Sequence, residues 1–148
     1  MSESATTSKY PFTRVACDAS VLIDLLVSGS ANPLFSEIIA NAVEPYTTEL
    51  AITEVQYILC RKLGATTAET KIDNLLASNA FEIFCISSLR PLASKIKCLR
   101  AISLADCFTI ALASIHGIPA LFATRETEID EELEKSPLPS NIYFLDEL

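Results

Sequence analysis

A chain of 148 residues is long enough for one domain with one sizeable core, and the 50% share of hydrophobic residues excludes a disordered chain. The net charge of −8 disfavours, at face value, a protein that grips phosphate backbones with a basic surface. The charge is uneven, because residues 126–148 carry eight acidic residues against one lysine, whereas residues 1–125 carry eleven acidic and ten basic residues. The body of the protein is therefore nearly neutral.

The cysteines and the termini indicate a cytoplasmic protein. Five widely spaced cysteines lie mostly in apolar runs, which predicts small, reduced, buried side chains. There is no C-x-x-C pair and only one histidine, so a structural zinc site is not expected. Residues 1–9 are polar and lack the apolar core of a signal peptide, and no apolar run has membrane-spanning length. We expect residues 1–12 to be poorly ordered, residues 13–148 to form a single domain, and no membrane to be involved.

Hydrophobic periodicity predicts strands and helices in alternation along the chain. In chain order, we expect a strand at 13–17, helices at 19–27 and from 33, a strand at 46–48, helices at 52–63 and 67–79, a strand at 81–86, helices from 88 and from 103, a strand at 120–123, an acidic helix near 126–134 and a strand at 142–145.

Capping residues set several of these helix boundaries. Asn32 and Pro33 have the order expected of an N-cap followed by the first helical residue. Thr67 is predicted to cap the helix at 67–79. Gly64 and Gly117 are predicted to end the helices that precede them.

Alternating strands and helices imply crossover connections and hence a central sheet whose strands are mainly parallel. We therefore predict an α/β fold, a three-layer α/β/α sandwich with four or five strands. Folds of this kind bind their ligands in the crevice at the carboxyl ends of the strands.

Four acidic side chains are expected at that edge of the sheet. Asp18 follows the first predicted strand, Glu54 lies in the helix after the second, Asp106 lies in the first turn of the helix beginning at Ser103, and Glu126 follows the fourth strand. Clustered carboxylates raise one another's pKa unless a cation joins them, and such hard oxygen ligands suit Mg²⁺ or Mn²⁺.

Each acidic residue also has an ordinary structural interpretation. Asp18 could serve only as an N-cap, and Asp106 could form a capping box with Ser103. Glu54 could be a solvated helix residue, and Glu126 could simply offset a helix dipole. The metal-site hypothesis therefore depends on all four falling where an α/β fold puts its ligands.

Four segments resemble the PIN-domain nucleases over residues 13–145. V-A-C-D-A-S-V-L-I-D-L-L at 15–26 is similar to the family's opening strand and helix, and I-S-L-A-D-C-F-T-I-A-L-A at 102–113 is similar to its L-S-x-A-D segment. L-A-I-T-E-V-Q-Y-I-L at 50–59 resembles the family's acid-bearing third helix, and I-P-A-L-F-A-T-R-E-T-E-I at 118–129 resembles its strand ending in T-x-D.

The resemblance implies specific roles for residues of the predicted site. It implies metal ligation and catalysis by Asp18, Glu54 and Asp106, with Ser20 and Thr124 as polar helpers. Glu126 takes the fourth place, where the family usually has Asp, and Glu128 or Asp130 could share or replace it.

The resemblance further implies hydrolysis of single-stranded RNA with bound Mg²⁺ or Mn²⁺, which would activate a water and stabilise the leaving oxygen. Small members of this family are commonly VapC-like toxins of VapBC-type toxin–antitoxin pairs, homodimeric and inhibited by an antitoxin protein. The alternatives are a stand-alone RNA-processing PIN nuclease and a catalytically inactive PIN-like binding scaffold. His116, the only histidine, is interpreted as part of a helix end, which disfavours a Ser-His-Asp or Cys-His hydrolase.

An RNA substrate requires basic residues around the acidic site. If Asp18, Glu54 and Asp106 are counted as metal ligands, residues 1–125 carry eight other acidic residues against ten basic ones, and the body becomes mildly basic. The candidates for RNA contact are Arg61, Lys62, Arg90, Lys95, Lys97, Arg100 and Arg125.

Overall fold

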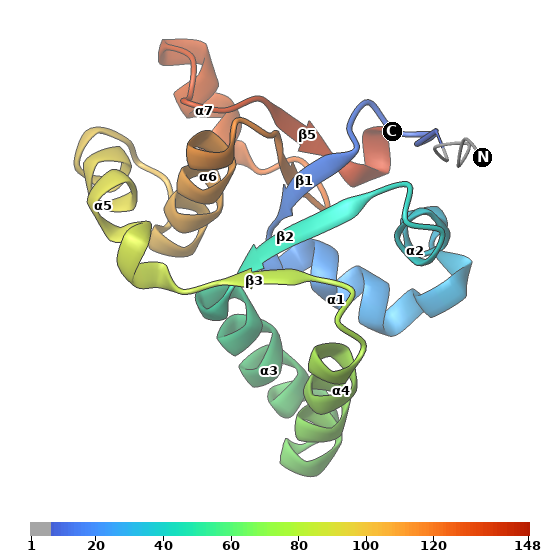
Figure 1. The fold of residues 1–148 in the computed structure, drawn as a ribbon. Coiled ribbons are helices and arrows are strands. Elements are labelled where there is room, and N and C mark those ends of the chain that lie inside the picture. Colours follow the sequence, from blue (N-terminus) through green and yellow to red (C-terminus); the bar gives the residue numbers. More distant parts are fainter. Residues whose placement is uncertain (1–6) are drawn as a thin grey trace.

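In the computed structural model, which describes residues 7–148, one sheet forms the centre of the molecule (Figure 1). Its strands are β1 (Arg14–Cys17), β2 (Glu44–Thr48), β3 (Glu82–Phe84), β4 (Ala120–Phe122) and β5 (Ile142–Phe144). They lie in the order β3-β2-β1-β4-β5, and every neighbouring pair is parallel. The predicted α/β class and the parallel sheet are confirmed.

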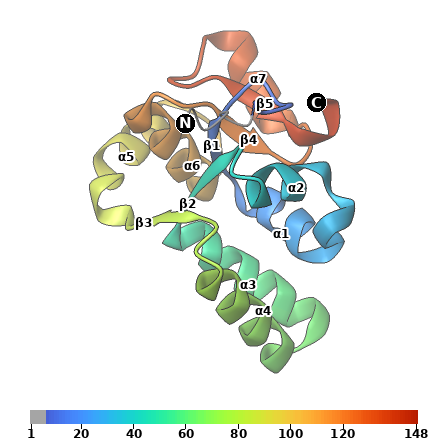
Figure 2. The ribbon, with the colours of Figure 1, turned by 45° about the vertical axis from the view of Figure 1, so that its right-hand side comes forward.

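Helices connect the strands and cover the sheet. They are α1 (Ala19–Ser28), α2 (Pro33–Ile39), α3 (Glu49–Leu63), α4 (Ala65–Ala77), α5 (Arg90–Leu99), α6 (Leu104–His116) and α7 (Thr127–Lys135). Short 3₁₀ turns lie at Gly29–Ala31, Ile86–Ser88 and Leu145–Glu147. Helices α3 and α4 form a hairpin that projects away from the sheet (Figures 1 and 2).

The two faces of the sheet each have a hydrophobic core, as a three-layer sandwich requires. Helices α1 to α4 pack on one face, and α5, α6 and α7 pack on the other. Because side chains alternate along a strand, neighbouring residues enter different cores. The first core receives Val15, Cys17 and Leu121, and the second receives Ala16, Ala120 and Phe122.

Most of the predicted helix ends are confirmed, and one is wrong. The Asn32 side chain accepts from the Leu34 amide at 3.0 Å, and Gly117 ends α6 in the left-handed conformation with φ of 63°. Thr67 does not cap a helix, because α4 begins at Ala65, immediately after α3. Gly64, with φ of 90°, lets the chain reverse at a single residue.

The expectation that the cysteines are buried is wrong for three of the five. Cys17 and Cys107 are buried, whereas Cys60, Cys85 and Cys98 are exposed. Cys60 and Cys98 lie within helices α3 and α5, on their exposed faces. Apolar neighbours in the sequence do not determine whether a cysteine lies on the buried or the exposed face of a helix or strand.

Poor order is predicted for residues 1–12, of which residues 1–6 lie outside the described residues. Of the remainder, Phe12 is buried, and the Tyr10 ring stacks on it with centroids 5.5 Å apart. That residues 13–148 form one domain stays a prediction. Over residues 7–148 no single helix is long and apolar enough to cross a membrane, although α1 and α2 together pass that test with a bend of 87° between them.

The core beneath α1 gives a first test of this packing. Leu22 is 1% exposed and Val27, on the same helix, is 70% exposed. Leu22→Ala should lower the free energy of unfolding by about 2–5 kcal/mol, because it leaves a cavity among packed side chains. Val27→Ala, the matched control, should change it by less than about 0.5 kcal/mol in the same chemical denaturation experiment. Equal effects of the two substitutions would contradict the assigned burial.

Candidate metal centre

The order of the strands brings several chain segments to one edge of the sheet. From β1 the chain adds β2 and β3 on one side, and β4 and β5 later join on the other side. The connections after β1 and β4 therefore leave neighbouring strands in opposite directions and open a crevice between them. Helix α6 precedes β4 in the sequence, so its first turn lies at this same edge.

Asp18 follows β1 and serves two purposes with its two carboxylate oxygens. Oδ2 accepts from the Ser20 backbone amide at 3.1 Å and from the Ser20 hydroxyl at 2.8 Å, so the N-cap interpretation is correct for this oxygen. Oδ1 is buried and has no hydrogen-bond partner in the described part of the chain. A buried oxygen left without a partner is costly, and it is available to a ligand.

Two more carboxylates join Asp18. One carboxylate oxygen from each of Asp18, Asp106 and Glu126 lies within 4.8 Å of the other two, with Asp18 and Asp106 buried and Glu126 half-buried. Ser103 accepts from the Asp106 amide at 3.3 Å and thereby caps α6. Glu126 is the N-cap residue of α7, but its side chain makes no capping hydrogen bond, so capping does not account for its position.

The proximity of these acidic groups perturbs their ionisation. Burial, the charge of Asp18 and hydrogen bonding to Glu126 together raise the pKa of Asp106 to about 9. Burial is also the main reason that the pKa of Glu126 is raised, with the charge of Asp18 adding to it. Without a cation, the cluster therefore holds a proton on Asp106 at neutral pH.

The relation to known proteins agrees with this arrangement. The sequence model of the PIN domain family matches residues 15–131, most of the chain and all three clustered acidic residues. The chain belongs to the PIN domain family. No curated protein sequence matches it.

Solved structures of low sequence identity share the fold of this PIN domain. A chain of DNA-bound VapBC from Salmonella typhimurium has 11% identity and a TM-score of 0.67, covering 90% of this chain and 99% of that one. A chain of Rickettsia felis VapBC2 bound to a promoter DNA fragment has 12% identity and a TM-score of 0.64, covering 88% and 98%. The Mycobacterium tuberculosis toxin VapC20, described as cleaving the sarcin-ricin loop, has 18% identity and a TM-score of 0.60, covering 80% and 94%.

Glu54 lies beside the cluster but outside the group of three. It is half-buried on α3, and burial together with the charges of Asp18 and Glu126 raises its pKa. Its carboxylate thus faces the same crevice and is not a fully solvated helix residue.

The polar helpers and the alternative fourth acidic residues lie in different surroundings. The Ser20 hydroxyl donates to Asp18 and accepts from the Ala123 amide at 3.0 Å, so it joins the ends of β1 and β4. Thr124 and Glu128 are exposed, and Asp130 is paired with Arg125 at 2.6 Å. Of Glu126, Glu128 and Asp130, the PIN domain brings only Glu126 into the cluster.

Several of the basic residues expected to contact RNA are engaged elsewhere. Arg100 donates to the carbonyls of Glu132, Ser136 and Pro137 at 2.7–3.1 Å, and Lys97 donates to the Ile102 carbonyl at 2.8 Å. Arg61 lies 5.1 Å from the Tyr57 ring centroid. Within residues 7–148, the candidates that form none of these contacts are Lys62, Arg90 and Lys95.

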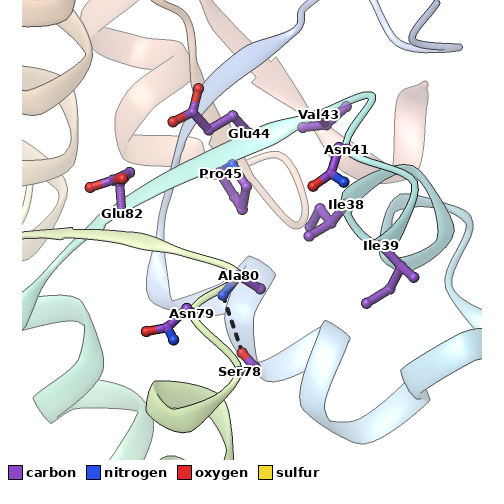
Figure 3. A pocket seen from close by; sticks show the side chains of 10 residues that line it. All are labelled: Ile38, Ile39, Asn41, Val43, Glu44, Pro45, Ser78, Asn79, Ala80 and Glu82. Atoms are coloured by element: carbon purple, nitrogen blue, oxygen red, sulfur yellow. Dashed lines mark hydrogen bonds between the residues drawn. The ribbon is translucent and has the colours of Figure 1, made fainter. Parts of the chain in front are cut away.

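Two other features of the molecule take no part in the centre. His116 lies at the opposite end of α6 from Asp106 and packs against the rings of Tyr46 and Phe84. A cavity of about 450 Å³ lies where β2 and β3 begin (Figure 3), and no residue of the acidic cluster lines it. It is lined by Ile38, Ile39, Asn41, Val43, Glu44, Pro45, Ser78, Asn79, Ala80 and Glu82.

The clustered residues fit a hard divalent cation of the kind that the PIN family implies. They supply three carboxylates from separate segments of the chain, one of which ends in the unpartnered Asp18 Oδ1. Asp18, Asp106 and Glu126 could hold the ion, with Glu54 at the side.

The raised pKa of Asp106 predicts how the stability of the metal-free protein depends on pH. Because the native state keeps a proton that the unfolded chain releases above its ordinary pKa of 3.8, the free energy of unfolding should fall as the pH rises from about 4 to about 9. The slope is at most about 1.4 kcal/mol per pH unit for each such proton.

Asp106→Asn should flatten this dependence and raise the melting temperature in EDTA at pH 8. Asp24→Asn removes an exposed carboxylate of α1 and is the matched control. Thermal melts from pH 4 to pH 9 measure both effects. A pH dependence that is unchanged by Asp106→Asn would contradict the assigned electrostatics.

Proposed function

We propose that this PIN domain is a metal-dependent endoribonuclease that hydrolyses phosphodiester bonds of single-stranded RNA with Mg²⁺ or Mn²⁺. The observation that carries this proposal is the convergence of three carboxylates, one with a buried unpartnered oxygen, at the switch point of the sheet. A buried cluster of this kind is unfavourable for stability, which gives it the character of a functional site.

The residues of the site have separate roles in this proposed reaction. Asp18, Asp106 and Glu126 bind the cation, and Glu54 adds negative charge at the rim of the crevice. When bound, a divalent cation lowers the pKa of a water and neutralises charge on the phosphate and the leaving oxygen. Ser20 orients the Asp18 carboxylate, and Thr124 lies at the solvent side of the loop after β4. No side chain needs to act as the nucleophile.

The chain's own basic residues make the RNA substrate compatible with an acidic protein. Lys62, Arg90 and Lys95 are exposed and are therefore available to phosphates. Arg100 and Arg125 serve structural contacts in this proposal.

Within the family, we propose a VapC-type toxin that acts in the cytoplasm as a homodimer and is inhibited by an antitoxin protein. The similarity of its fold to chains of VapBC complexes, over nearly their whole length, supports this choice. A homodimer would have twice the 16.1 kDa mass of the chain in light scattering.

The nuclease activity depends on the clustered carboxylates. With Mn²⁺, wild-type protein should cleave single-stranded RNA, and Asp18→Asn and Asp106→Asn should each lower the rate by more than the 10- to 100-fold loss typical of removing an outer-sphere partner. Asp24→Asn should cleave as the wild type does. Varied RNAs left intact by the wild type, or cleaved equally by both site variants, would contradict the proposal.

The toxin assignment predicts an effect in cells. Induced expression of the wild type should arrest growth of a bacterial host, whereas Asp106→Asn should be tolerated, because only the wild type depletes RNA. Immunoblots must show equal accumulation of the two proteins. Equal growth at equal levels would contradict the toxin assignment and favour a stand-alone RNA-processing nuclease.

A further inference from the structure

Arg125 connects the loop after β4 to two other parts of the chain. Its Nε and Nη2 atoms donate to Glu147 Oε1 and Oε2 at 3.0 and 3.2 Å, and its Nη1 donates to Asp130 Oδ1 at 2.6 Å. The guanidinium also lies 4.6 Å from the centroid of the Phe144 ring. One side chain thus holds the loop, α7 and the C-terminal turn together.

The same loop is fixed from its other end. The Ala123 amide donates to the Ser20 hydroxyl at 3.0 Å, and the Ala123 carbonyl accepts from the Asp146 amide at 3.1 Å. Glu126 lies directly after Arg125, and its side chain makes no capping hydrogen bond of its own. The direction of the Glu126 carboxylate is therefore set by the backbone on either side of it together with its hydrogen bond to Asp106.

We propose that Arg125 is a positioning residue that aims the Glu126 carboxylate at the cation through its paired contacts with Glu147 and Asp130. The inference rests on the proposed function, since it assumes that the cluster binds a metal ion. Residues 145–148 then support the metal centre through Glu147, although they contribute no ligand.

The charge of Arg125 and its contacts predict opposite changes in metal affinity when the residue is replaced. Removing a positive charge close to a cation site should strengthen metal binding if Arg125 acted only through its field. Loss of the contacts that orient Glu126 should weaken it. Arg125→Lys separates the two effects, because it keeps the charge and loses the planar fork that engages both oxygens of Glu147.

The test is the Mn²⁺ dissociation constant, measured by electron paramagnetic resonance of the free ion. Arg125→Gln should weaken binding about tenfold, and Arg125→Lys should weaken it by a smaller factor. Lys71→Gln, the control, removes a positive charge from α4 and should leave binding unchanged. Binding by Arg125→Gln that equals or exceeds that of the wild type would overturn the proposal.

A double-mutant cycle shows whether Arg125 acts through Glu126. In the Glu126→Gln background, Arg125→Gln should cause no further loss of Mn²⁺ affinity. An additional tenfold loss there would mean that Arg125 supports the site by another route, and the proposal would be wrong.

Hydrogen exchange in EDTA tests the same contacts without any metal ion. Arg125→Gln should speed exchange of the amides of residues 123–127 and leave those of residues 107–113 in α6 unchanged. Unchanged exchange in the loop would overturn the positioning role. If the wild type bound no Mn²⁺, the proposed function would fail, and the exchange result alone would decide whether Arg125 holds the loop.

Discussion

Repulsion among three carboxylates confined at one edge of the sheet is the constraint on which this molecule depends. One oxygen from each lies within 4.8 Å of the other two in a partly buried crevice, and the pKa of Asp106 is raised to about 9. Such a cluster opposes folding unless protons or a cation neutralise it. The stability that maintains it comes from the two cores on either side of the sheet, which hold the segments after β1 and β4 and the first turn of α6 in place.

Short-range sequence patterns predicted the positions of Asp18 and Asp106, which depend on local structure. Asp18 is the N-cap of α1 and Asp106 lies in the first turn of α6, and the alternation of strands and helices was enough to assign both to one edge of the sheet. The sequence did not decide which residue is the fourth acidic one, because Glu126, Glu128 and Asp130 all follow the same strand. Arg125 binds Asp130 and Glu147, and no local pattern in the sequence predicts the contact with Glu147, which spans 22 residues.

The same limit explains the errors at the cysteines and at α4. Whether Cys60 or Cys98 is buried depends on how an amphipathic helix is turned against its neighbours, which apolar neighbours in sequence do not specify. The helix at 65–77 begins early because Gly64 permits a reversal at one residue, so no threonine cap is needed. The acidic C-terminal region is also less repulsive than its composition suggests, because Glu132, Asp130 and Glu147 all pair with basic side chains.

The central claim is that the clustered carboxylates form a cation site. Anomalous X-ray scattering from crystals grown or soaked with Mn²⁺ tests this most directly, because it locates the ion independently of any activity. We expect an anomalous peak within bonding distance of oxygens of Asp18 and Asp106 at the carboxyl edge of β1 and β4, and no such peak in crystals of Asp18→Asn. Wild-type crystals with no peak there, or with a peak that persists in Asp18→Asn, would contradict it.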